Sequence, residues 1–497
     1  MTIPFKKAPP EYDQRVLFPT NIFDLLPEDH DCIVYSELFC HLDTSKLEAS
    51  FSTRGQNAYH PKKIVSILIY AYSQGVFSSR QIQKKCSEDL GFMFIAQMNC
   101  PNFRVLSDFR KNNNEFFHSC FKQTVMLAME TGLASLGHVS LDGSKFKANT
   151  SKHKAMSYKR LKEREAELTK EIEALVAKAK ACDHEENIEY EQQTGYELPE
   201  DLRFKEKRLR KIKAAKAALE KRERKQNPNR AIDDKKQISF ADHDARIMGK
   251  NNFAYSYNGQ ISVDKDHQII VGQHLTQQAS DVQEVGRALS DIKEATGRLP
   301  DKASFDNGYF SGPNLAALES HEIDAYVSCG KGEQQIASPD EIGEGLLKRS
   351  NFIYIPQEDC FQCPRRKKLT LVRQDNDGLR YYRSSKEACL GCDLWERCSA
   401  SKIGRPRTLK RDSHEELRTQ MREKMTTEEA KAIYKLRKQI VEPVFGQIKN
   451  LGFRGFSVRG LEGVSGEFSL MCSVHNIRKM VKHVFRAKVC PMAKGFS

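Results

Sequence analysis

The chain has 497 residues, of which 39% are hydrophobic and 29% charged, a composition typical of a soluble globular protein and unlike a disordered or fibrous one. Its 80 Lys and Arg against 66 Asp and Glu give a formal net charge of +14, which favours a polyanionic partner such as nucleic acid. The longest apolar run, residues 64–72, is far shorter than a membrane-spanning helix, and the first residues lack the apolar core of a signal peptide. We therefore expect a cytoplasmic, nucleoid-associated protein with no membrane partner, whose 14 Cys are thiols or metal ligands.

Residues 1–135 predict a helical N-terminal domain that binds DNA. Pro61 suits the first turn of a helix that Gly75 ends, and Asn102 can cap a later, basic helix. Short capped helices of this kind resemble a helix-turn-helix, which makes Arg104 and Arg110 candidate contacts to bases. An ordinary helical bundle with a solvated basic face explains the same pattern equally well.

The hydrophobic period changes near residue 139 and predicts an α/β domain with a mixed sheet. Residues 136–157 contain a short apolar strand that ends at Asp142. Residues 229–335 contain a strand hairpin, a helix, a strand that ends at Asp306, another helix and a last strand. Such sheets place their ligands at strand ends, so the two acidic residues are candidates for a site.

Between these two parts, residues 158–228 predict a charged helical insertion, either a helical hairpin or a short coiled coil. Its second half is strongly basic over residues 203–225. A solvated helical face is the favoured interpretation of this run, and a contact to the DNA backbone is the functional alternative.

A third carboxylate stands in residues 426–497, where we expect a catalytic helix region and a basic tail. Glu442 is accompanied by Tyr434, Arg437, Lys438 and Lys449. Lys438 lies four residues before Glu442 and Lys449 seven after it, a spacing that places all three on one helical face, although Pro443 would kink that helix. One carboxylate among cations is a poor core but a good platform for a metal ion and phosphates.

The segments VSLDGSKF, FDNGYFS and YKLRKQIVEPVFGQIK, in this order, resemble the DDE transposases of bacterial insertion sequences. Residues 60–82 are similar to the N-terminal domain of that group, and a Cys-rich interruption before the third acid is another of its features. In the family signature three residues separate Arg from Glu, whereas four separate Arg437 from Glu442 here. Either Lys438 takes the place of the Arg, or the helix shifts at Pro443.

The resemblance implies a ribonuclease-H-like catalytic domain that cleaves DNA and transfers the strand. Asp142, Asp306 and Glu442 would be the catalytic acids and hold two Mg²⁺ or Mn²⁺ ions, for which carboxylate oxygens are the expected ligands. Tyr434, Lys449 and one of Arg437 or Lys438 would hold DNA phosphates. The implied partners are double-stranded DNA, as element ends and target, and further copies of the chain when bound to DNA.

Residues 336–425 form a Cys-rich insertion with zinc-ribbon-like spacing. Cys360 and Cys363 make one CxxC pair, Cys389 and Cys392 make another, and Cys398 follows as an alternative ligand. Two such pairs suit tetrahedral, structural Zn²⁺, and reduced structural thiols are the other interpretation.

Two other functions are consistent with the sequence. The chain could be a non-catalytic, domesticated or regulatory, sequence-specific DNA-binding protein, but such a protein has no need of all three acids. A ribonuclease-H-like nuclease without strand transfer differs only in the group that attacks the phosphate.

Overall fold

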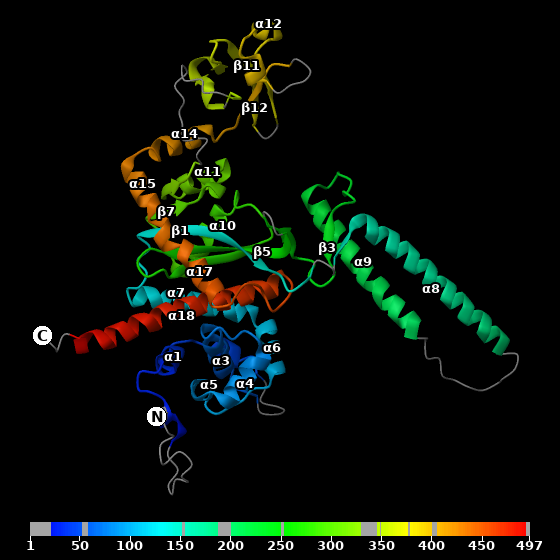
Figure 1. The fold of residues 1–497 in the computed structure, drawn as a ribbon, viewed down its shortest axis with the longest axis vertical. Coiled ribbons are helices and arrows are strands. Elements are labelled where there is room, and N and C mark those ends of the chain that lie inside the picture. Colours follow the sequence, from blue (N-terminus) through cyan, green and yellow to red (C-terminus); the bar gives the residue numbers. More distant parts are fainter. Residues whose placement is uncertain are drawn as a thin grey trace, which may run out of the picture.

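The computed structural model describes residues 21–51, 58–151, 155–186, 200–249, 253–329, 345–347, 349–375, 378–399 and 405–493. Its centre is a mixed six-stranded sheet with the strand order β4-β5-β1-β7-β8, in which β6 also pairs with β5 (Figure 1). The strands are β1 (His138–Lys147), β4 (Arg246–Met248), β5 (Ala254–Asp264), β6 (Ile270–Thr276), β7 (Lys302–Phe305) and β8 (Asp324–Val327). β5 runs antiparallel to β1, β4 and β6, whereas β7 runs parallel to both β1 and β8. The α/β class with a mixed sheet is therefore confirmed.

Helices cover both faces of this sheet. On one face, Ile292 of α10 (Val285–Thr296) fills the space beside Gly272 of β6. On the other face, Phe468 of α18 (Leu461–Ala493) packs against Gly259 of β5. A side chain at either glycine would collide with the helix, so both positions need glycine for the close approach. α11 (Gly312–Ser320) connects β7 to β8.

The N-terminal helices continue the same hydrophobic core and are not a separately packed unit. They are α1 (Asp31–Cys40), α2 (Ser45–Glu48), α3 (Pro61–Ser73), α4 (Ser79–Glu88), α5 (Leu90–Ile95), α6 (Phe103–Asn112) and α7 (Asn114–Glu130). One buried cluster runs from Cys32 through the sheet to Val481. The predicted caps are confirmed: Pro61 begins α3, Gly75 follows it with a positive φ of 74°, and the Asn102 side chain accepts from the Arg104 N–H at 2.9 Å.

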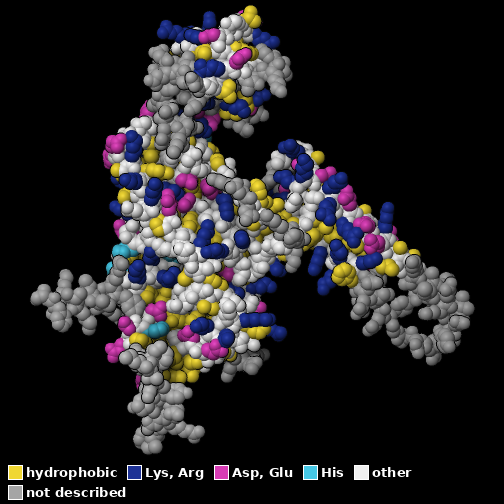
Figure 2. All heavy atoms as spheres, viewed as in Figure 1, with side chains coloured by type: hydrophobic (Ala, Val, Ile, Leu, Met, Phe, Trp, Pro, Cys, Tyr) yellow, Lys and Arg dark blue, Asp and Glu magenta, His cyan; other side chains and the backbone are white. Residues whose placement is uncertain are grey.

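A helical hairpin occupies the predicted insertion and projects from the sheet (Figure 1). α8 (Tyr158–Glu186) and α9 (Glu200–Gln226) pack through Leu161, Leu168 and Ile212, and the short strands β2 (Ala155–Ser157) and β3 (Gln237–Ser239) close its base. Figure 2 shows Lys and Arg side chains along the hairpin interspersed with Asp and Glu. Lys205 pairs with Glu171 at 2.9 Å and Lys216 with Glu165 at 2.7 Å, so part of the basic run is neutralised within the hairpin.

The Cys-rich insertion has its own small core and a five-stranded antiparallel sheet, ordered β13-β12-β11-β10-β9. These strands are β9 (Ile353–Ile355), β10 (Cys360–Gln362), β11 (Lys368–Gln374), β12 (Arg380–Arg383) and β13 (Thr408–Arg411), with the short helices α12 (Lys386–Cys389) and α13 (Trp395–Cys398). The chain returns to the central sheet through α14 (Glu415–Lys424), α15 (Glu428–Lys435), α16 (Arg437–Ile440) and α17 (Glu442–Asn450). Among the described helices, none has the length and apolar character to cross a membrane.

Candidate active site

Asp142 lies within β1, in the part of this strand that extends beyond its parallel neighbour β7. β1 pairs with β7 only through Ser140, whereas its pairing with β5 continues to Lys147. The prediction that the strand ends at Asp142 is therefore wrong, because β5 supplies backbone partners beyond it. Asp142 lies two residues beyond the pair Ser140–Ser304, as Asp306 does on the other chain segment, and the charge of Asp306 acts on Asp142.

Asp306 follows β7 directly and caps a short 3-10 helix, residues 307–309. Its carboxylate accepts a hydrogen bond from the Gly308 N–H at 2.8 Å, which fixes the side chain at the end of the strand. This agrees with the acidic turn predicted there. Parallel β1 and β7 thus bring two carboxylates from distant segments to one region of the sheet.

Arg437 joins Asp142 to the third acid. Its guanidinium lies 2.9 Å from Asp142 Oδ1 and 3.6 Å from Glu442 Oε1, and it donates to the Leu141 carbonyl oxygen at 3.0 Å. Arg437 is 5% exposed, so this cation is used inside the protein and not on its surface. Arg437 therefore holds two of the acids together. Lys438, the other residue expected to bind a DNA phosphate, is exposed.

The expected break at Pro443 is present, and it orients Glu442. α16 ends at Ile440, and α17 starts afresh at Glu442 with Pro443 in its first turn, where proline is tolerated. Glu442 therefore stands at a helix N-terminus, where a negative charge is stabilised by the helix dipole. Its side chain is 48% exposed, which leaves the carboxylate accessible from solvent.

The acids differ in their electrostatic surroundings. Burial raises the pKa of Asp142, and the neighbouring charge of Asp306 adds to this effect. Arg437 and the Gly143 N–H oppose it, but the net direction is upward. Because a positive charge favours the ionised carboxylate, a cation bound beside Asp142 would lower this pKa again.

Lys449 of α17 approaches the same region. Its ammonium group contacts the Ser144 hydroxyl, two residues after Asp142, and lies over the ring of Phe146 at 5.4 Å. Burial lowers the pKa of Lys449, and the charge of Asp142 opposes that shift. Tyr434 is half-buried on α15, where it packs against the cluster of Tyr326, Cys329 and Met425.

The two arginines predicted to read bases have different positions. Arg104 is exposed on α6 and stays available to a partner. Arg110 is 5% exposed and donates to the Tyr72 hydroxyl, the Phe77 carbonyl oxygen and the Ser79 hydroxyl, so the expectation that it contacts DNA does not fit the structure. The alternation of charge on α6 could not reveal this, because the burial depends on α3 and α4.

Asp281 is a carboxylate beside the site that sequence reasoning missed. Its Oδ1 accepts from Asn258 at 2.7 Å and Gln260 at 2.6 Å, both on β5, and lies 4.0 Å from Lys145 Nζ. The absence of a side chain at Gly143 makes room for these groups. In the sequence, Asp281 reads as the start of a helix. Only its hydrogen-bond partners on β5 distinguish it from an ordinary residue of that kind.

The cysteine cluster differs in membership from the two CxxC pairs expected from the sequence. Cys363, Cys389, Cys392 and Cys398 line one cavity of about 390 Å³ in the Cys-rich insertion. Cys360 is not among its lining residues, and its thiol instead lies 3.4 Å from Glu358. The alternative ligand Cys398 therefore replaces Cys360 in the set that the structure brings together.

No set of three or more His, Cys, Asp or Glu within the described residues is arranged to hold a metal ion. The donor chemistry nevertheless suits divalent ions, since Asp142, Asp306 and Glu442 offer only hard carboxylate oxygens. The four sulfurs of the cavity are likewise of the type that Zn²⁺ prefers.

Two segments of the chain match known protein families. Residues 362–481 match the family described as Transposase DDE domain, and residues 20–112 match the family described as Transposase domain (DUF772). The first match contains Glu442 but neither Asp142 nor Asp306, which lie outside it. Comparison with curated proteins and with solved structures gave no match.

Proposed function

Since the two matches identify this chain as a DDE-type insertion-sequence transposase, we propose that it binds the ends of its mobile element, cleaves the DNA with divalent ions and joins the freed strands to target DNA. The observation that carries this proposal is the convergence of Asp142 and Glu442 on one guanidinium, with Asp306 directly after the neighbouring strand β7. The three residues come from segments far apart in the chain. A protein that only bound DNA would not need them together.

The strand pattern supports a ribonuclease-H-like catalytic domain. Three strands, β1, β5 and β6, pair antiparallel in succession, and β7 and β8 then extend the sheet parallel to β1. The first acid lies on the central strand and the second at the end of its parallel neighbour. The helical hairpin and the Cys-rich module are insertions into this domain, and α3 to α6 would contact DNA through exposed residues such as Arg104.

Each site residue would have a distinct role in the proposed reaction. Asp142, Asp306 and Glu442 would hold Mg²⁺ or Mn²⁺, which when bound supplies activation of the attacking oxygen and stabilisation of the leaving oxygen. Arg437 keeps two of these acids in place and limits their mutual repulsion. Lys449, beside Asp142, would hold a DNA phosphate next to the reacting one.

Cleavage of a DNA fragment carrying the element end tests this function. Asp142→Asn, Asp306→Asn and Glu442→Gln should each abolish cleavage in Mg²⁺ while DNA binding is retained, because each replaces an anionic ligand by a neutral amide of similar shape. Glu428→Gln, which makes the same acid-to-amide change at an exposed carboxylate outside the three acids, is the control and should cleave. Equal cleavage by the wild type in EDTA would refute the proposal, and binding without any cleavage would favour the regulatory DNA-binding protein.

We also propose a structural Zn²⁺ on Cys363, Cys389, Cys392 and Cys398. The support is their gathering in one cavity. The N–H of Lys367 also donates to Cys363 Sγ at 3.3 Å, a bond that favours a thiolate.

A further inference from the structure

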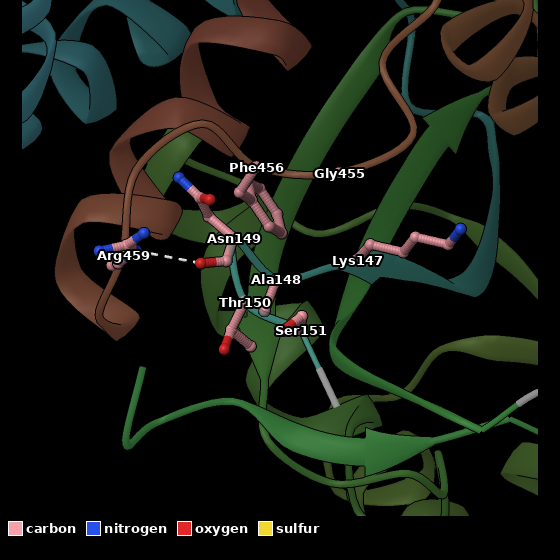
Figure 3. Close-up of a pocket in the computed structure, with 8 residues that line it drawn as sticks. All are labelled: Lys147, Ala148, Asn149, Thr150, Ser151, Gly455, Phe456 and Arg459. Atoms are coloured by element: carbon pink, nitrogen blue, oxygen red, sulfur yellow. Dashed lines mark hydrogen bonds between the residues drawn. The ribbon is translucent and has the colours of Figure 1, made fainter. Parts of the chain in front are cut away.

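The end of β1 is joined to the loop of residues 454–460, which we call the β1 seam. The Lys147 N–H donates to the Arg454 carbonyl oxygen at 3.2 Å, and the Phe456 N–H donates to that of Lys147 at 2.9 Å. Arg459 Nε donates to the Asn149 carbonyl oxygen at 3.0 Å. A recess of about 470 Å³ lies along the seam, and Figure 3 shows the side chains of Lys147 and Arg459 on opposite sides of it.

The seam is strongly cationic. Lys147, Arg454 and Arg459 are exposed, and within the described residues none of them forms an ion pair with a carboxylate. Arg454 also donates to the Lys449 carbonyl oxygen at 3.4 Å, which places it next to the lysine that approaches Asp142. The hydroxyls of Thr150 and Ser151 complete the lining of the recess. Guanidinium and ammonium groups that have no carboxylate partner, together with hydroxyls, are the groups that bind phosphate oxygens.

Two carboxylates, one of them buried, hold the loop in this position. Glu467, 1% exposed, accepts from the Ser457 N–H at 2.7 Å and the Val458 N–H at 3.3 Å, and Asp244 accepts from the Leu461 N–H at 3.0 Å. Glu467 in turn accepts from the Tyr72 hydroxyl at 2.6 Å, and Arg110 lies 3.9 Å from it. The loop is therefore fixed before any ligand arrives, which lowers the entropic cost of binding. The same network explains the burial of Arg110.

We propose that the β1 seam binds backbone phosphates of the DNA strand that flanks the cleaved bond. Lys147 lies five positions after Asp142 on β1, and at about 3.3 Å per residue the seam lies roughly 17 Å from that acid. A DNA strand that passes the acids would therefore reach the seam within one helical turn, or about ten nucleotides, of the cleavage position. The proposal rests on the proposed function, because it takes Asp142 as the position of the scissile phosphate.

Binding over a salt series tests the seam. The double variant K147A/R459A should bind both element-end and random DNA more weakly, and the slope of log affinity against log salt should fall by about 1.8, or about 0.9 for each phosphate that is no longer neutralised. The control is K265A/K293A, which removes two exposed lysines on the β5–β6 turn and α10. Its slope should stay at the wild-type value. The thermal melt of K265A/K293A should coincide with that of the wild type, and the melt of K147A/R459A should fall only by the loss of the exposed hydrogen bond from Arg459 to Asn149.

A scan with neutral methylphosphonates locates the contact. Phosphates within about ten nucleotides of the cleavage position are neutralised one at a time. At least one neutralisation should weaken wild-type binding and have no further effect on K147A/R459A. The inference is overturned if the wild type cleaves DNA but K147A/R459A keeps the wild-type slope, or if the methylphosphonate penalty is the same in both proteins. A wild type that neither binds nor cleaves element-end DNA would instead refute the proposed function, and the inference with it.

Discussion

Arg437 is the residue whose removal tests the architecture of the site most severely. Arg437→Ala leaves the Asp142 carboxylate, 21% exposed, without its 2.9 Å partner. Breaking one side of a buried pair costs about 3–5 kcal/mol, and the partial exposure of Asp142 places this pair near the lower limit. The contact to Glu442, at 48% exposure, adds little, and removal of the bond to the Leu141 carbonyl oxygen adds about 1 kcal/mol. We expect a total destabilisation of about 3–4 kcal/mol.

A double-mutant cycle separates this destabilisation from simple truncation. In an Asp142→Asn background no buried charge is left behind, so Arg437→Ala should cost only about 1–2 kcal/mol. Urea unfolding followed by far-UV circular dichroism measures all four proteins. Because Arg437 lowers the pKa of Asp142, its removal should also move the acid limb of the cleavage profile to higher pH. Equal destabilisation in both backgrounds would show that the ion pair does not hold Asp142, and would refute the reasoning.

Three further predictions concern other parts of the chain. Elemental analysis of protein purified without chelators should find about one zinc ion per chain. Cys389→Ser and Cys398→Ser should each lose this ion, whereas Cys360→Ser should keep it. Loss of zinc from Cys360→Ser alone would contradict the revised ligand set. Burial lowers the pKa of His274, but hydrogen bonds to Asp291 and Glu284 outweigh this effect and raise the pKa above its usual value. The stabilisation of the fold by His274 is therefore full below about pH 6.5 and is lost as the pH rises through the raised folded-state pKa. His274→Gln should therefore flatten the decline of unfolding free energy above that pH, and an unchanged profile would exclude His274 as its source. Arg110→Ala should lower the melting temperature by several degrees. Arg104→Ala should leave the melting temperature unchanged and weaken binding to the element end more than to random DNA. The reverse pattern would mean that Arg110 is accessible.

Local signals in the sequence predict local structure well here. Pro61, Gly75 and Asn102 mark helix ends because capping involves only neighbouring residues. The turn at Asp306 follows for the same reason, since its carboxylate bonds to an N–H two residues away. The place of Asp306 in a turn directly after a strand could therefore be predicted without a structure.

Features that depend on distant partners could not be predicted in this way. Asp142 does not end its strand because β5, more than a hundred residues later, pairs with the residues beyond it. Arg110 resembles a surface cation until α3 buries it beside Tyr72. The burial of Arg437 beside Asp142, with Lys438 exposed, depends on which side of the short helix α16 faces β1.

Binding of Mn²⁺ to the complex with element-end DNA, followed by electron paramagnetic resonance, tests the central claim most directly. The wild type should take up two ions per active site, and Asp142→Asn should lose them while still holding the DNA. A substitution at an exposed carboxylate remote from the site, Glu428→Gln, should retain both ions. If Asp142→Asn bound Mn²⁺ as the wild type does, the three carboxylates would not be the metal ligands, and the assignment of the active site would be wrong.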